Sequence, residues 1–256
     1  MNGPTAPTRH FAEALWTLVL AAYAALLAYL LLTGRLTDLV HPRMTPLVAV
    51  ALVLLLLLAV AQGRSFLAGR RAVQRRPLLA LFILPFLAVP LFLRSTGNAK
   101  VEAQDLSISA AFGPSAIAAP RVPADIPSSG PIVIDQDNYY RFYRTILSRP
   151  EAYTGRTLVV TGFVYHAPQL KGATRFLTAR ELMWCCAVDV TTIGFVSDLD
   201  QGTVPPEDSW VMARGTLGTT TVDSPDGSGP TVVPLLRVDT LQTMDGYDYT
   251  YVYPVS

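Results

Sequence analysis

Two long apolar runs near the N-terminus constrain the fold of this chain more than any other feature. Residues 15–32 and 44–61 are each eighteen consecutive residues without a charged side chain. A helix rises 1.5 Å per residue, so about twenty residues cross a hydrocarbon core of about 30 Å. Both runs are near this length. They predict two membrane-spanning helices, at about residues 11–32 and 44–61.

A signal peptide is the alternative interpretation of the first run, because Ala22-Tyr23-Ala24 resembles a cleavage site. Its apolar core continues past that point, which favours an uncleaved anchor. A third uncharged run, residues 77–93, contains three prolines. Proline removes a helical hydrogen bond, so this run is either a kinked span or a re-entrant piece, and we favour the span. We therefore expect a membrane domain over residues 1–93, with two to three transmembrane helices in contact with lipid.

The basic residues predict an orientation in the membrane. The connection at residues 62–76 contains five arginines, and the positive-inside rule places it in the cytoplasm. The N-terminus is then cytoplasmic as well, and a third span carries everything after residue 93 to the outside. Without that span the C-terminal half stays in the cytoplasm. We expect a multi-pass membrane protein with a cytoplasmic N-terminus and an extracytoplasmic C-terminal domain.

The composition changes along the chain and separates two parts. Residues 1–130 carry eleven Lys or Arg against five Asp or Glu, whereas residues 131–256 carry nine against fourteen. This balance gives no reason to expect nucleic-acid binding. Residues 94–130 are rich in Pro, Ser, Gly and Ala and predict a tether. Residues 131–256 are long enough for one compact domain.

Hydrophobic periodicity predicts that this domain is mainly β. Asp135 or Asp137 can cap one helix that runs to about residue 148. Beyond it, Gly162 and the later phrase 213–217 suit bent strands, so we expect an OB-like five-stranded barrel preceded by that helix. The expected strands are 157–165, 174–177, 182–190, 193–197, 209–217 and 231–241. Tyrosines alternate in the tail, residues 245–254, which favours an edge strand over a segment that lies on the membrane or a partner.

The only two cysteines, Cys185 and Cys186, are adjacent, and Asp189 follows three residues later. On a regular strand Cys185 and Asp189 would stand about 13 Å apart, too far to share one metal ion. If the chain bends after Cys186, the two thiolates and the carboxylate can bind Zn(II) or another thiophilic ion such as Cu(I), with His166 as a fourth ligand. The strand alternation itself gives a core face and a cleft face: Trp184, Cys186, Val188 and Val190 against Met183, Cys185, Ala187 and Asp189.

Two other roles for the cysteines stay open. Unpaired cysteine is often a small buried hydrophobe, and thiol redox chemistry needs only a reactive thiolate. A disulfide between neighbours is strained, because their Cα atoms are about 3.8 Å apart. His166 alone is an ordinary surface or hydrogen-bonded residue. The chain has no Ser-His-Asp order, phosphate-binding glycine loop, HExxH or CxxC, so we expect no catalytic residues and no enzyme.

Several phrases along the chain together resemble one bacterial family. They are residues 39–44, 132–135, 153–155, 161–165 and, most specifically, Cys185-Cys186-Ala187-Val188-Asp189. The family is the YcgQ-like family, described as subunits of two-component permeases. Its pattern has alanine where this chain has Val188, and its closing Pro-Asp-Pro-Tyr phrase matches residues 246–249 only loosely.

The resemblance implies an accessory membrane subunit that works beside a larger polytopic permease, with a link to metal homeostasis. In that interpretation the outward β domain binds a metal ion or hands it to the permease. The competing hypothesis is a structural or ligand-binding OB-like module that docks the permease through its tyrosine-rich tail, with the cysteines in its core.

Overall fold

The computed structural model describes residues 6–67, 126–167, 170, 172, 174–223, 230–245 and 251–254. The third apolar run, at 77–93, and the tether up to residue 125 lie outside these residues. The chain divides into two compact units, Met1–Gln104 and Asp105–Ser256. Each is described by itself.

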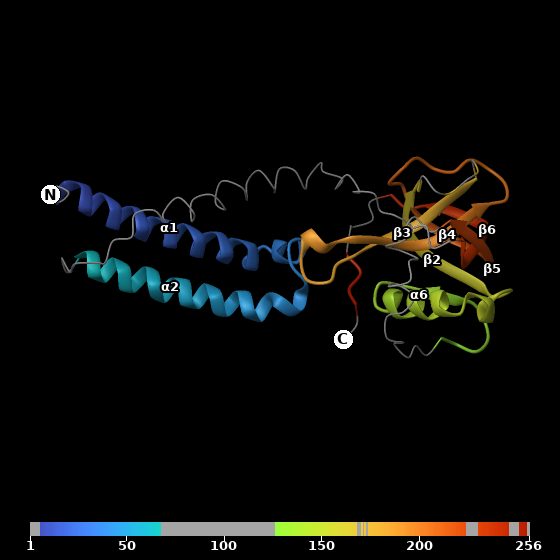
Figure 1. The fold of residues 1–256 in the computed structure, drawn as a ribbon, viewed down its shortest axis with the longest axis horizontal. Coiled ribbons are helices and arrows are strands. Elements are labelled where there is room, and N and C mark those ends of the chain that lie inside the picture. The colour runs from blue at the N-terminus through green and yellow to red at the C-terminus, as the bar shows by residue number, and fades with distance from the viewer. Residues whose placement is uncertain are drawn as a thin grey trace. The chain divides into compact units, whose positions relative to one another are not determined.

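The first unit contains a helical hairpin. Its helices α1 (Ala6–Leu32) and α2 (Thr45–Leu67) lie side by side and run in opposite directions (Figure 1). Two short 3₁₀ helices join them, η1 (Arg35–Asp38) and η2 (Pro42–Met44). Gly34 ends α1 with a φ of 72°, which glycine adopts without strain. Nδ1 of His41 accepts the backbone N–H of Arg43 at 3.0 Å and so begins the turn that leads into α2.

One stretch of this hairpin is both long and apolar enough to cross a membrane. It runs from Pro42 to Arg64, and none of it is buried against other parts of the protein. The apolar part of α1, Thr17–Leu32, is shorter. Within the described residues, length and composition therefore support one candidate span, where the sequence predicts two at these positions.

The second unit is a mainly β domain built on one six-stranded sheet (Figure 1). The sheet order is β1-β2-β3-β4-β6-β5, and β2 also pairs with β5. The pairs β1–β2 and β4–β6 are parallel and the others are antiparallel. The strands are β1 (Ile132–Ile134), β2 (Thr157–Tyr165), β3 (Arg175–Leu182), β4 (Thr191–Leu199), β5 (Trp210–Asp223) and β6 (Pro230–Thr243). The prediction of a mainly β domain is confirmed, and β1 is a strand that the periodicity did not single out.

Glycine allows β2 to change neighbours. Residues 158–160 of β2 pair with β1, and residues 163–165 pair with β3. A Cβ atom at Gly162, between these two stretches, would lie 2.4 Å from the carbonyl oxygen of Ala179. Only a residue without a side chain permits such a close approach of two backbones.

The helix α6 (Tyr139–Ser148) supplies one wall of the core. Its aromatic residues are buried, and the ring of Tyr143 lies edge-on against that of Phe195 of β4, with the centroids 5.5 Å apart. The residue before the helix is Asn138 rather than Asp135 or Asp137. Asp135 acts one turn earlier, where its carboxylate accepts the N–H groups of Asp137 and Asn138 at 3.0 Å each. The short 3₁₀ helix η3 (Pro150–Tyr153) follows and leads into β2.

The prediction of a strand over residues 182–190 is wrong. β3 ends at Leu182 and β4 begins at Thr191, and between them the chain forms a loop that contains the short 3₁₀ helix η4 (Ala187–Asp189). In the tail, the described residues 251–254 form a single bridge, between Val252 and Leu182, instead of a full edge strand.

Candidate metal centre

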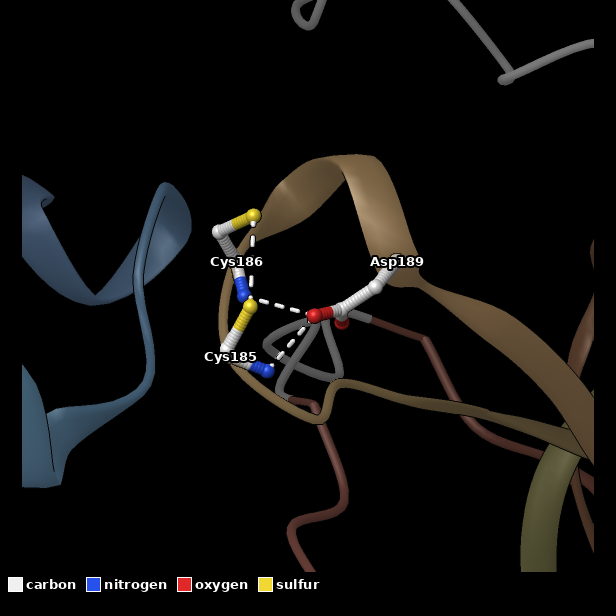
Figure 2. A group of neighbouring side chains, drawn as sticks. All are labelled: Cys185, Cys186 and Asp189. Atoms are coloured by element: carbon white, nitrogen blue, oxygen red, sulfur yellow. Dashed lines mark hydrogen bonds between the residues drawn. The ribbon is translucent and has the colours of Figure 1, made fainter.

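The loop between β3 and β4 is folded around the carboxylate of Asp189. Its Oδ1 accepts the N–H of Trp184 at 2.8 Å, and its Oδ2 accepts the N–H groups of Cys185 at 2.7 Å and Cys186 at 3.1 Å. The N–H of Asp189 in turn donates to the carbonyl of Cys186 at 3.0 Å. Figure 2 shows the carboxylate turned back toward the backbone nitrogens of both cysteines. Because these N–H groups are held within the loop, they are not offered to a neighbouring strand.

The predicted division of this segment into a core face and a cleft face is wrong for the same reason. Met183, expected on the cleft face, is fully buried. Trp184 and Val188, expected in the core, are 49% and 88% exposed. The ring of Trp184 lies edge-on against Tyr140 of α6, with the centroids 5.9 Å apart.

The bend brings the two sulfur atoms and the carboxylate together. The Sγ atoms of Cys185 and Cys186 are 3.7 Å apart, and neither cysteine is in a disulfide. Ligand atoms of Cys185, Cys186 and Asp189 all lie within 4.8 Å of one another. Two sulfurs on a tetrahedral Zn(II), at about 2.3 Å each, are about 3.8 Å apart, and a sulfur and a carboxylate oxygen are about 3.5 Å apart. The sulfur atoms already have this separation, and a carboxylate oxygen that lies up to 4.8 Å from a sulfur needs a shift of no more than about 1.3 Å.

His166, the proposed fourth ligand, is not part of this group. It follows the end of β2, and its Nδ1 lies 2.5 Å from the Oε2 of Glu207, which also accepts the N–H of His166 at 2.9 Å. Glu207 belongs to the connection between β4 and β5, forty-one residues further along the chain. The described structure therefore brings together three of the four predicted ligands.

Hydrogen bonds in the loop favour the protonated form of the Cys185 thiol. The bond that the Cys185 thiol donates to Asp189, together with its contact to Cys186, raises the pKa of Cys185 to about 12. Burial by itself would raise the pKa of Asp189, but the Cys185 thiol and the three backbone N–H groups outweigh it and hold that pKa below its usual range. At neutral pH the loop therefore contains a protonated thiol at Cys185 and an ionised carboxylate, and a metal ion that binds here must displace the proton.

The role of Asp189 in holding the backbone was missed by strand periodicity. The spacing Cys186-x-x-Asp189 is that of a capping box, in which a carboxylate reaches back to the N–H three residues earlier. This spacing was the available signal. It competes directly with the alternating pattern, and in the structure the capping arrangement prevails.

Two family models match the chain. The model of the DUF1980 N-terminal domain matches residues 15–93, and the model of the DUF1980 C-terminal domain matches residues 116–254. The chain belongs to the DUF1980 family. The candidate metal centre lies within the C-terminal DUF1980 domain, and both helices of the hairpin overlap the N-terminal one. No curated protein matches the sequence of this DUF1980 chain.

Proposed function

We propose that this DUF1980 protein is an accessory, membrane-anchored subunit of a two-component permease, and that its β domain binds a metal ion or hands it to the permease. Cys185, Cys186 and Asp189 supply the ligands. Zn(II) or another thiophilic ion is the expected metal, because two thiolates and one carboxylate favour such ions. The permease role comes from the resemblance to the YcgQ-like family.

The observation that carries the metal role is the geometry of the loop. Three ligand atoms from one segment lie within 4.8 Å of one another, and the sulfurs are 3.7 Å apart. Cys185 is exposed, so an ion can reach it from solvent. Three protein ligands leave one position of a tetrahedral site for water or for a ligand of the partner, and this suits transfer better than permanent storage.

The test is the metal content of the full chain purified in detergent. After dialysis against excess Zn(II) and removal of unbound ion, we expect about one Zn per chain by elemental analysis. The variant with Cys185→Ser and Cys186→Ser should lose this ion. His166→Ala is the matched control and should retain it, because His166 lies against Glu207. Equal stoichiometry in the wild type and the double cysteine variant would overturn the proposal.

The multi-pass anchor and the outward domain belong to the same proposal. α2 supplies a helix long enough to span, α1 is the second candidate, and the run at 77–93 is the third. The order of strand pairing supports an OB-like barrel, because the pairs run from β2 through β3, β4, β6 and β5 and then return to β2. In this arrangement β1 is an added strand beside β2.

The same circular pairing favours a second candidate function, an OB-like docking module without a metal site. In that case the cysteines are structural. Because Cys186 is half-buried, Cys186→Ala should then destabilise the fold by about 1 to 2 kcal/mol. Transport by the partner permease should stay intact. Loss of transport in a Cys186→Ala protein that still folds would count against this candidate.

A thiol redox protein is the third candidate, and the protonation of the loop weighs against it. The raised pKa of Cys185 leaves little thiolate at neutral pH, and the thiolate is the reactive form. Mild alkylation of the full chain at pH 7, read out by peptide mass spectrometry, should therefore label Cys185 slowly. Rapid labelling would restore the redox candidate.

A further inference from the structure

The closing segment, which we define as residues 251–254, lies beside the end of β3. The N–H of Val252 donates to the carbonyl of Glu181 at 2.8 Å, and the carbonyl of Val252 accepts the N–H of Met183 at 3.0 Å. The pairing is parallel and is centred on Leu182. Val252 is fully buried, so this contact is part of the domain core.

A second contact ties the closing segment to the interior of the domain. Nε2 of Gln136, between β1 and α6, donates to the carbonyl of Tyr251 at 2.6 Å. Oε1 of the same side chain accepts a hydrogen bond from the guanidinium of Arg180, which is only 1% exposed. That guanidinium lies over the rings of Trp210 and Tyr139, at 5.2 and 5.6 Å from their centroids. The closing segment is therefore anchored through Gln136 to the buried Arg180 of β3.

These contacts reach the loop between β3 and β4 at its first residue, Met183. Four consecutive backbone N–H groups, from Met183 to Cys186, are all hydrogen-bonded. Val252 holds the first of them, and Asp189 holds the other three. The closing segment thus fixes the peptide from which the loop departs, and the carboxylate fixes the loop itself.

We infer that the closing segment is a positioning element for the candidate metal centre: its pairing with Glu181 and Met183 holds the loop in the conformation that brings Cys185, Cys186 and Asp189 together. Without the closing segment, the N–H of Met183 loses its bond to Val252, and only the Asp189 carboxylate still holds the start of the loop. The Asp189 hydrogen bonds then open more often, and the sulfurs and carboxylate separate. The inference rests on the proposed function for the identity of the ligand, but the effect on the loop does not depend on it.

The first test measures the loop without any metal. In the full chain in detergent, hydrogen exchange is followed at the amides of residues 184–186, which bond to Asp189 and not to the closing segment. A chain that ends after residue 250 should exchange these amides at least about tenfold faster than wild type. A chain that ends after residue 254 is the control and should behave as wild type. Faster exchange at Met183 alone, with residues 184–186 unchanged, would overturn the inference.

A matched pair of substitutions keeps the test valid if the shortened chain does not fold. Val252→Pro removes the N–H that donates to Glu181, whereas Val252→Ala trims the buried side chain and keeps both backbone bonds. The proline variant should show the faster exchange at residues 184–186, and the alanine variant should not. Equal exchange in the two variants would contradict the inference, because loss of the Val252–Glu181 backbone bond would then have no effect of its own on the loop.

The second test uses Co(II) as the probe of the metal centre. Thiolate-to-metal absorption reports ligation by the cysteines, and a chelator competition gives the affinity. Val252→Pro should bind Co(II) at least about tenfold more weakly than Val252→Ala. If the wild type shows no thiolate absorption with Co(II), the proposed metal function fails, and the exchange experiment still decides the role of the closing segment. Equal Co(II) affinity in both variants would overturn that role.

Discussion

Glu181 is a carboxylic acid in a partly buried position on β3, and its ionisation opposes folding. Burial, with a smaller contribution from the charge of Asp208, raises its pKa from 4.5 to about 7. The folded protein therefore binds this proton more tightly than the unfolded chain. Stability should fall as pH rises from about 4.5 to about 7 and then level off, by at most about 3 kcal/mol from this group.

The prediction is tested by the melting temperature of the full chain in detergent between pH 4.5 and 8. Glu181→Gln removes the ionisation, so its advantage over wild type should grow with pH and be largest above pH 7. Glu151→Gln, at an exposed position on η3, is the control and should follow the wild-type curve. A constant difference between Glu181→Gln and wild type across this range would show that the charge of Glu181 is not the cause.

The candidate site shows which properties of single residues can be predicted from sequence. The set of Cys185, Cys186 and Asp189 was predictable, because soft and carboxylate ligands are concentrated in one short segment. The bend that brings them together could not be predicted, because the same residues fit both the alternation of a strand and the spacing of a capping box. The pairing of His166 with Glu207 joins residues forty-one positions apart, and local sequence patterns do not contain that information.

At the scale of elements, strands were predictable where they are long and alternate regularly. β2, Thr157–Tyr165, matches the expected bounds, whereas β5 continues six residues beyond the expected end. The additional residues of β5 pair with β6 in an antiparallel ladder, so β6 supplies their hydrogen-bond partners. β1 has three residues and exists through its parallel pairing with β2. Such elements depend on distant partners, so short-range periodicity does not find them.

Gly215, where the backbones of the paired strands β5 and β6 approach closely, gives a prediction at the scale of elements. The ladder has a register shift between Arg214 and Gly215, and a Cβ at Gly215 would lie 1.9 Å from the carbonyl oxygen of Arg237. The atom in the way is backbone, so it cannot move without displacing β6. Gly215→Ala should therefore destabilise the domain by about 3 kcal/mol, at the upper end of the range for overpacking.

Gly218 on the same strand is the matched control. The nearest atoms to a Cβ there are 3.9 Å away, so Gly218→Ala should leave stability unchanged or raise it slightly. The melting temperatures of both variants, measured in the full chain, check the prediction. A loss in Gly215→Ala no larger than in Gly218→Ala would mean that β5 and β6 do not approach as closely as described.

At the scale of the whole molecule, the amino-acid distribution predicts two parts of different character, and the structure contains two compact units. Helix α2 was predictable because its apolar run is long and uncharged. In the proposed membrane arrangement, the side on which the β domain lies depends on the positive charges and on the number of spans, so it depends on whether the run at 77–93 crosses. The five arginines of residues 62–76 and that run together place the domain outside in our proposal.

This orientation predicts the outcome of thiol labelling in intact cells. The background is Cys185→Ser with Cys186→Ser, which removes every native cysteine. In it, Thr240→Cys, an exposed position on β6, should react with a membrane-impermeant maleimide without permeabilisation. Ala72→Cys, within the arginine-rich connection, should react only after the membrane is opened, because our proposal places that connection in the cytoplasm. If both sites react only after permeabilisation, the run at 77–93 does not cross the membrane. The candidate metal centre would then face the cytoplasm, and the permease would exchange metal with it on that side.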